Sequence, residues 1–150
     1  MRLVIQRVTE ASVMIDSKIF SEIGEGLLIL AGVEMDDTLE DIEWLASKTA
    51  SLRIFPDEKG VMNLSIKDIN GEILAVSQFT LMASTRKGNR PSYIRAAGHD
   101  KAIPLYEGFC KKLSENIGKE VKKGVFGADM KVSLVNDGPV TIIIDSKLRE

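Results

Sequence analysis

Polar residues follow an apolar stretch in the middle of the chain, where Ile-Leu-Ala-Val at residues 73–76 leads into Ser77, Gln78, Phe79 and Thr80. A buried strand that ends in this way places polar side chains and free backbone N–H groups at a sheet edge, and such N–H groups stabilise a developing oxyanion. Phe79 is suited to stacking on a base or to core packing. Taken alone, the tetrapeptide also fits a purely structural strand end.

A basic loop follows at residues 85–92, with the sequence Thr-Arg-Lys-Gly-Asn-Arg-Pro-Ser. Arg86, Lys87 and Arg90 are suited to contacts with phosphate groups, and Gly88 lets the backbone approach a ligand closely. The loop does not have the pattern of a Walker motif. The same composition is typical of an exposed basic turn, so its value as a nucleic-acid contact depends on what lies beside it.

A Gly-Pro pair, Gly138 and Pro139, lies in the segment Asn-Asp-Gly-Pro-Val-Thr at residues 136–141, between two predicted strands. Gly-Pro is a turn signal, and the bond before proline adopts the cis form far more readily than other peptide bonds. The sequence leaves the isomer open. A cis bond would hold a rigid pair of carbonyl groups in a tight turn, whereas the ordinary interpretation is a hairpin.

The composition restricts the available chemistry. The chain has one histidine, His99, and one cysteine, Cys110, which argues against a zinc site of the usual Cys/His type. No Ser/His/Asp triad is evident around the one histidine. We therefore expect no metal and no cofactor. Cys110 has apolar neighbours and is expected at a buried helix position.

Charge is unevenly distributed. The net charge of −2 gives the whole molecule no attraction to nucleic acid. Residues 82–101 nevertheless carry five basic side chains against one acid, and a second basic cluster comprises Lys119, Lys122 and Lys123. Such clusters are usually solvated surface, and they indicate nucleic-acid binding only when they lie beside an active site.

Alternating and apolar segments predict the elements of the first half of the chain. Strands are expected at residues 3–8, 11–15, 18–23 and 26–33, with a hairpin at Asp16 and Ser17. A helix is expected next, because Asp37 or Thr38 can cap it and Asp41 stands at capping-box distance from Thr38. Apolar positions then recur at helical spacing, at Ile42, Leu45, Ala46 and Thr49.

In the second half, Asn70 and Gly71 predict a hairpin between strands at residues 62–69 and 72–79. A second helix is expected over residues 101–116, with Pro104 in its first turn. Further strands are expected near residues 121–125, 131–135 and 140–145.

This order of elements predicts an α+β fold. We expect a single layered β/α/β domain over residues 1–150, with two main helices packed against mostly antiparallel sheets. Because several strands are apolar on both faces, two sheets are expected to sandwich the helices. No apolar run approaches the roughly 18 residues of a membrane span, and residues 1–8 do not resemble a signal peptide. A cytoplasmic protein without membrane contact is expected.

Together, these segments resemble the D-aminoacyl-tRNA deacylase family. Residues 77–80 and 136–141 are similar to its two signature motifs, and residues 1–8, 85–92 and 126–130 also look like family segments. Each motif is weak alone, but the combination is specific and spans essentially the whole chain.

The resemblance implies hydrolysis of the ester that joins a D-amino acid, or glycine, to tRNA. Ser77, Gln78, Phe79 and Thr80 would line the pocket for the terminal adenosine and the ester. The terminal ribose 2′-hydroxyl would help to activate water or the ester, and N–H groups near Phe79 and Thr80 would stabilise the oxyanion. Thr80 is a rival candidate for a direct nucleophile, although no base is evident near it.

The resemblance also implies a homodimer with its active sites at the interface. Gly138 and Pro139 would reach into the pocket of the partner, where their carbonyl groups would exclude an L side chain but admit glycine. Phe126 and Met130 would pack near the same pocket.

Aminoacylated tRNA is the implied partner, and Arg86, Lys87 and Arg90 are the implied contacts to its acceptor stem. Two other functions remain open. A tRNA- or RNA-binding module without catalysis would use the same basic residues, and a hydrolase of free small esters would not need them.

Overall fold

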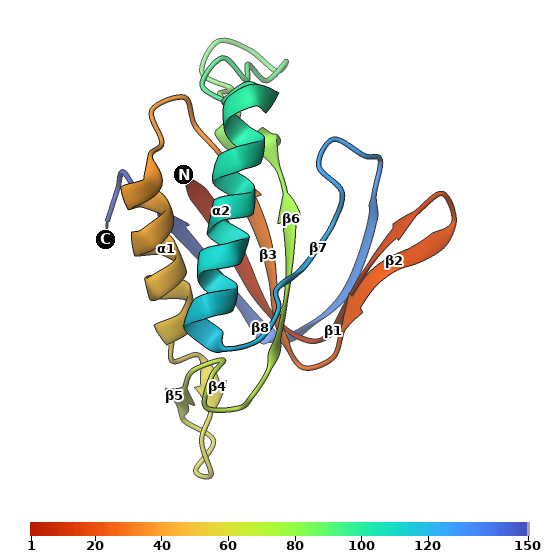
Figure 1. Ribbon diagram of the computed structural model, residues 1–150, viewed down its shortest axis with the longest axis vertical. Helices are drawn as coiled ribbons and strands as arrows, with labels where there is room; N and C mark the ends of the chain where they lie inside the picture. Colours follow the sequence, from red (N-terminus) through yellow and green to blue (C-terminus); the bar gives the residue numbers. More distant parts are fainter. Residues whose placement is uncertain (150) are drawn as a thin grey trace.

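The computed structural model describes residues 1–149, which form two helices, a large curved sheet and a small hairpin (Figure 1). The elements in chain order are β1 (Arg2–Ile15), β2 (Lys18–Ile23), β3 (Gly26–Gly32), α1 (Leu39–Ser51), β4 (Phe55–Pro56), β5 (Met62–Leu64), β6 (Glu72–Ser77), the 3-10 helix η1 (Phe79–Met82), α2 (His99–Ile117), β7 (Lys122–Lys123) and β8 (Lys131–Asp145).

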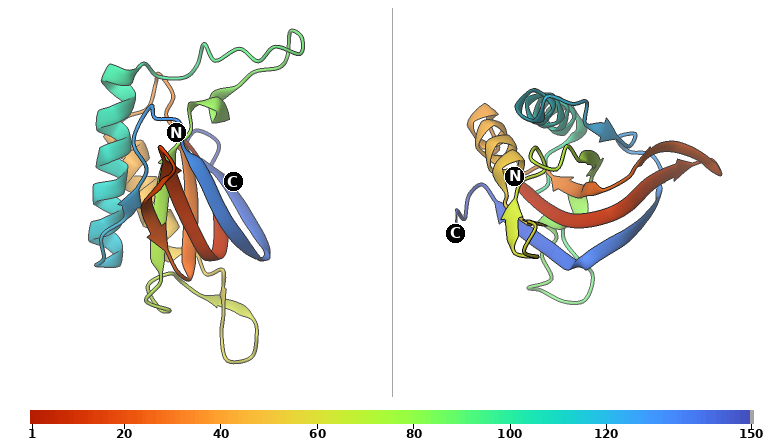
Figure 2. Two further views of the ribbon diagram at one scale, coloured as in Figure 1. Left: turned by 90° about the vertical axis from the view of Figure 1, so that its right-hand side faces the viewer. Right: turned by 90° about the horizontal axis from the view of Figure 1, so that it is seen from below.

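The main sheet has six strands, five of which follow the order β2-β1-β3-β6-β7. The first half of β1 pairs with β3 and its second half with β2, while β8 pairs with β1 along most of its length. The sheet is mixed, because β3 pairs with β6 and β6 with β7 in parallel, while the other pairs are antiparallel. The long strands β1 and β8 curve strongly, so the sheet nearly closes into a barrel (Figure 2, right). Register shifts in the β1–β8 pair accompany this curvature.

Both faces of the sheet are apolar, but only one carries helices. Leu27 and Ile29 of β3 pack into the core beneath α1 and α2, whereas Leu28 faces a second core inside the curve of the sheet. The expected β/α/β sandwich is therefore wrong. Strands that are apolar on both faces are explained by a sheet that folds over itself, with both helices outside on one face (Figure 2).

Helix α1 follows the prediction closely. Its apolar stripe is buried, and the Asp41 carboxylate accepts a hydrogen bond of 2.8 Å from the backbone N–H of Thr38 at the cap. Helix α2 begins two residues earlier than predicted, at His99, because the Gly98 carbonyl accepts the N–H groups of both Lys101 and Ala102. Pro104 consequently lies in the second turn.

The two predicted hairpins had different outcomes. Asp16 and Ser17 both have positive φ and join β1 to β2, as predicted. Asn70 also has positive φ, at 51°, but the strands around it are not a hairpin: β5 pairs with β4, and β6 pairs with β3. The interior of β6 is buried on both faces, which favours a central position in the sheet over a place beside the short, partly exposed β5.

The C-terminal prediction of two strands around a Gly-Pro hairpin is wrong. Residues 131–145 form the single strand β8, which continues through Gly138 and Pro139 and pairs with β1 on both sides of them. Within residues 1–149, no helix is both long and apolar enough to cross a membrane.

Candidate active site

A pocket of about 630 Å³ opens where β3 and β6 end, beside the start of α2 and the loop at residues 124–130. Five of the predicted site residues line it: Ser77, Gln78, Phe79, Phe126 and Met130. Small apolar side chains make up much of the remaining wall, including Ala31, Val33, Ala97 and Ala102. The structure thus brings together residues from segments about fifty positions apart in the sequence.

The β6 side of the pocket is fixed by the parallel pairing with β3. The backbone N–H of Gln78 donates to the carbonyl of Ala31 at 2.8 Å, which carries the ladder to the end of β6. A Cβ atom at Gly32 would lie 3.0 Å from the backbone carbonyl oxygen of Gln78, so glycine at this position allows the ends of β3 and β6 to approach closely.

The turn after Ser77 presents backbone N–H groups. In the 3-10 helix η1, the first backbone hydrogen bond runs from the N–H of Leu81 to the carbonyl of Gln78. The N–H groups of Phe79 and Thr80 therefore have no partner within η1. Phe79 also lines the pocket, whereas Thr80 lies outside the set of lining residues.

The side chain of Thr80 contacts Gln78. Gln78 Nε2 donates to Thr80 Oγ1 at 2.6 Å. An amide nitrogen cannot accept a proton, so this contact does not activate the hydroxyl as a nucleophile. Phe79 is 56% exposed and makes an edge contact with Tyr93, with ring centroids 5.0 Å apart.

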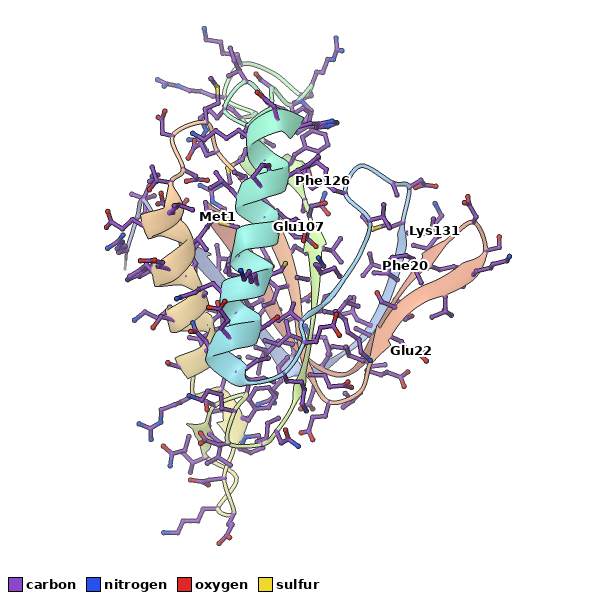
Figure 3. All side chains as sticks on the ribbon, viewed as in Figure 1. Met1, Phe20, Glu22, Glu107, Phe126 and Lys131 are labelled. Carbon is purple, nitrogen blue, oxygen red and sulfur yellow. The ribbon has the colours of Figure 1, made fainter. Side chains whose placement is uncertain are left out.

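The opposite wall is held by aromatic contacts. The Phe126 ring lies 6.0 Å from Tyr106 and 5.5 Å from His99, centroid to centroid, at the upper end of α2 (Figure 3). Tyr106 is buried and donates its hydroxyl to the Ala75 carbonyl on β6 at 2.9 Å. Helix α2 and the sheet thereby fix the position of Phe126.

Met130 reaches the pocket over a glycine. A Cβ atom at Gly124 would lie 2.5 Å from the Met130 sulfur, so glycine supplies the room that this side chain occupies.

Gly138 and Pro139 are joined by a cis peptide bond. Gly138 has φ of +124°, and a Cβ atom there would lie 3.0 Å from Arg7 Nη2. The segment is anchored further by Asn136, whose side-chain oxygen accepts the N–H of Val140 at 2.9 Å.

Arg7 is a site residue that the sequence did not single out. It is 8% exposed, donates to the carbonyls of Ile54 at 2.7 Å and Asp137 at 3.2 Å, and pairs with the Asp137 carboxylate at 3.0 Å. The available signal was the alternation of β1, because Arg7 continues the inward-facing positions Leu3 and Ile5, and a buried guanidinium needs partners.

Gly138 and Pro139 lie away from the pocket of their own chain. Strand β8 meets β1 on either side of Arg7, and Arg7 is opposite Leu27 of β3, whereas the pocket begins at Ala31. Leu27 and Ala31 are four residues apart on β3, which corresponds to about 13 Å along the strand. One chain alone does not bring the Gly-Pro segment to the pocket.

Arg86, Lys87 and Arg90 lie on a projecting loop, here called the basic arm (residues 83–98), which extends away from the helices (Figure 2, left). Backbone hydrogen bonds between Ser84 and Ser92 close its outer part. The three side chains are exposed and lie outside the set of residues that line the pocket.

The second basic cluster is engaged within the fold. Lys122 pairs with Glu72 at 3.3 Å, Lys123 pairs with Glu107, and Lys119 donates to the Asn70 carbonyl. Two of the three charges in this cluster are therefore paired with carboxylates.

Cys110 occupies a buried position on α2, as predicted, and is 2% exposed. Burial raises the pKa of its thiol to about 12, so the reactive thiolate is scarce at neutral pH. Among residues 1–149, no group of three or more His, Cys, Asp or Glu side chains is placed to hold a metal ion.

The sequence matches the family model described as D-Tyr-tRNA(Tyr) deacylase over residues 4–145. It is 65% identical to a D-aminoacyl-tRNA deacylase of Flavobacterium psychrophilum and 66% identical to one of Porphyromonas gingivalis, in each case over the full length of both chains.

Solved structures share the fold. One described as a c-Myc DNA unwinding element binding protein has a TM-score of 0.91 and 40% identity, covering 97% of this chain and 98% of its own. Another, described as a probable eukaryotic D-amino acid tRNA deacylase, has a TM-score of 0.82 and 17% identity, covering 95% and 97%, and shows the fold alone. The family model and the full-length relatives establish that the chain belongs to the D-Tyr-tRNA(Tyr) deacylase family.

Proposed function

We propose that the pocket at the end of β6 binds the terminal adenosine and the aminoacyl ester of charged tRNA, and that water cleaves the ester there. By family the chain is an enzyme, a D-aminoacyl-tRNA deacylase that hydrolyses an ester. The observation that carries the proposed site is the convergence of Ser77, Gln78, Phe79, Phe126 and Met130 on one pocket. Free D-amino acid and tRNA are the products, and glycine is accepted in place of a D-amino acid.

The N–H groups of Phe79 and Thr80 stabilise the oxyanion in this proposal. Water attacks the ester carbonyl, whose oxygen becomes negative. The two N–H groups are unpaired within η1, and the first residue of η1, Phe79, lines the pocket. When the intermediate collapses, the bond to the ribose oxygen breaks and that oxygen takes a proton.

The terminal ribose 2′-hydroxyl helps to activate the water or the ester. This part of the proposal is favoured by the surroundings of Thr80. Its hydroxyl accepts a hydrogen bond from the Gln78 amide, and that amide nitrogen cannot take a proton from the hydroxyl. Direct attack by Thr80 would need a proton acceptor at that place.

Chiral selection requires two copies of the chain. Gly138 and Pro139 lie about 13 Å along the sheet from the pocket of their own chain, so in a homodimer they would enter the pocket of the partner. Their carbonyl groups would then occupy the space that an L side chain needs, whereas glycine has no side chain to exclude.

The basic arm contacts the acceptor stem of tRNA. Arg86, Lys87 and Arg90 are exposed on the basic arm, whose Tyr93 contacts Phe79 and whose Ala96 and Ala97 line the pocket. Phosphate contacts of this kind are insensitive to base sequence and weaken with salt. The proposed place of action is the cytoplasm, where tRNA is charged.

The test is release of labelled amino acid from D-Tyr-tRNA and L-Tyr-tRNA by the purified chain. Rapid loss of the D ester with the L ester spared is the expected result. Equal loss of both esters would exclude the chiral selection, and loss of neither would exclude the deacylase activity.

A nucleic-acid-binding function without catalysis is the second candidate. It is favoured by the 40% identical structure described as a DNA unwinding element binding protein. Tight binding of uncharged tRNA or DNA together with complete inactivity toward the D ester would establish it in place of hydrolysis.

A further inference from the structure

The one histidine of the chain lies at the pocket but takes no part in the proposed mechanism. His99 is the first residue of α2 and lines the pocket together with Gly98 and Ala102 of the same region. Its position follows from the early start of α2, two residues before the start predicted from the sequence.

The orientation of the His99 ring is set by Phe126. The two ring planes are 83° apart with centroids separated by 5.5 Å, and Phe126 is itself held by Tyr106 at 6.0 Å. Because an imidazole has two faces, Phe126 covers one at most. His99 is an exposed residue that lines the pocket, so its ring is accessible to a ligand there.

The two ends of the pocket suit different parts of the substrate. The N–H groups at the start of η1 hold the ester at the β6 end in the proposed mechanism. The nucleoside bonded to that ester then extends toward the opposite wall, which is formed by the start of α2 and the loop at residues 126–130. That wall carries two aromatic side chains, His99 and Phe126.

We infer that His99 is a binding residue for the terminal adenosine of tRNA, with its imidazole stacked on the adenine base. This inference rests on the proposed function and adds one recognition residue to that site. Stacking on an aromatic ring strengthens the binding of a base without hydrogen-bond specificity. The imidazole therefore acts on substrate affinity and leaves the chemical step unchanged.

The experiment uses two stable probes, 3′-D-tyrosylamido-3′-deoxyadenosine and the same ribose amide without the base. His99→Ala should weaken binding of the first probe about tenfold, in the range of base–aromatic stacking, and leave binding of the second unchanged. His99→Phe should bind the first probe within about threefold of the wild type, because it restores a ring. Ile103→Ala, one turn further along α2 and 39% exposed, is the matched control and should bind both probes normally.

Kinetics on D-Tyr-tRNA give a second readout. His99→Ala should raise KM and preserve kcat, and melting temperatures of the variants should match. The inference is overturned if His99→Ala binds the first probe normally, if it weakens both probes equally, or if His99→Phe behaves like His99→Ala.

Failure of this inference is distinct from failure of the proposed function. If the wild type hydrolyses D-Tyr-tRNA and His99→Ala does so with unchanged KM, the deacylase function stands and the role of His99 falls. If the wild type hydrolyses neither ester, the proposed function fails, and the role of His99 fails with it.

Discussion

At the scale of single residues, glycines shape the proposed site as much as polar side chains do. Gly124 leaves room for the Met130 sulfur, and Gly138 passes close to the Arg7 guanidinium. A methyl group at Gly138 would lie 3.0 Å from Arg7 Nη2, on a backbone with φ of +124° that L residues rarely adopt. The Gly-Pro segment and Arg7 therefore constrain one another.

Replacing this glycine should damage activity more than stability. We expect Gly138→Ala to lower kcat/KM for D-Tyr-tRNA at least about tenfold, because displacing the segment misplaces the groups that meet the substrate. The strain should cost about 1–3 kcal/mol of folding free energy, measured by urea unfolding.

Gly60→Ala is the matched control for strain. Gly60 also has positive φ, +75°, but a Cβ atom there would meet nothing within 4 Å. This variant should lose stability and keep full activity. Equal activity losses in both variants would show that strain alone, rather than the position of Gly138, explains the effect.

At the scale of elements, the cap of α1 was readable from the sequence and the partners of strands distant along the chain were not. Thr38 and Asp41 lie three residues apart, so the start of α1 is a local property. The pairing of β6 with β3 joins segments more than forty residues apart, and an apolar pattern does not specify which strand lies beside it. Arg7 escaped notice for the same reason, since its contacts come from residues 54 and 137.

The cap of α1 makes stability depend on pH. Burial alone would raise the pKa of Asp41, but hydrogen bonds from Ser146, Lys147 and Thr38 outweigh it and hold the pKa well below its ordinary value of 3.8. The carboxylate therefore contributes stability above about pH 4, and this contribution is lost as the pH falls through the pKa of the folded state.

Asp41→Asn should cost roughly 1–2 kcal/mol at pH 7, and the difference from the wild type should shrink below pH 3.8. Urea unfolding at pH 7, 5 and 3 measures this. Glu40→Gln, an exposed change in the same turn, should have little effect at each pH. A difference for Asp41→Asn that stays constant down to pH 3 would contradict the assignment.

The basic arm is the second element with a measurable role. Replacing Arg86, Lys87 or Arg90 by Gln should raise KM for D-Tyr-tRNA and reduce its salt dependence, by about 0.7–0.9 in log–log slope for each lost phosphate contact. Hydrolysis of a short D-tyrosyl-adenosine ester should be unaffected, because it has no acceptor stem. Lys111→Gln, exposed on α2, is the control. An equal loss with the short ester would place these residues in the pocket's chemistry instead.

At the scale of the whole molecule, the pocket and the Gly-Pro segment lie at different levels of one sheet. In the homodimer proposed above, each segment enters the pocket of the other copy. The sequence suggested both parts through a family resemblance, but their separation within one chain depends on the register of β1 with β3 and β8.

Mixing two impaired variants tests this arrangement. Gly138→Ala keeps an intact pocket, and Ala128→Trp fills the pocket but keeps the Gly-Pro segment. After subunit exchange at equal amounts, heterodimers with one complete site should restore about a quarter of wild-type activity. Active sites built within single chains would give no recovery of activity. A monomer in sedimentation would also contradict the arrangement.

The near-closure of the main sheet has a consequence for solubility. Between β2 and β7 the sheet is joined by side chains, with Ser21 Oγ donating to the Lys123 carbonyl at 2.9 Å and Lys122 Nζ to the Glu22 carbonyl at 2.7 Å. Strand β2, at the end of the hydrogen-bonded order, also carries exposed Ile19 and Phe20 (Phe20 is labelled in Figure 3), and an exposed apolar end strand favours strand addition by another chain. These two hydrogen bonds occupy part of the β2 edge that an added strand would need, so we expect the near-closure of the sheet to limit aggregation.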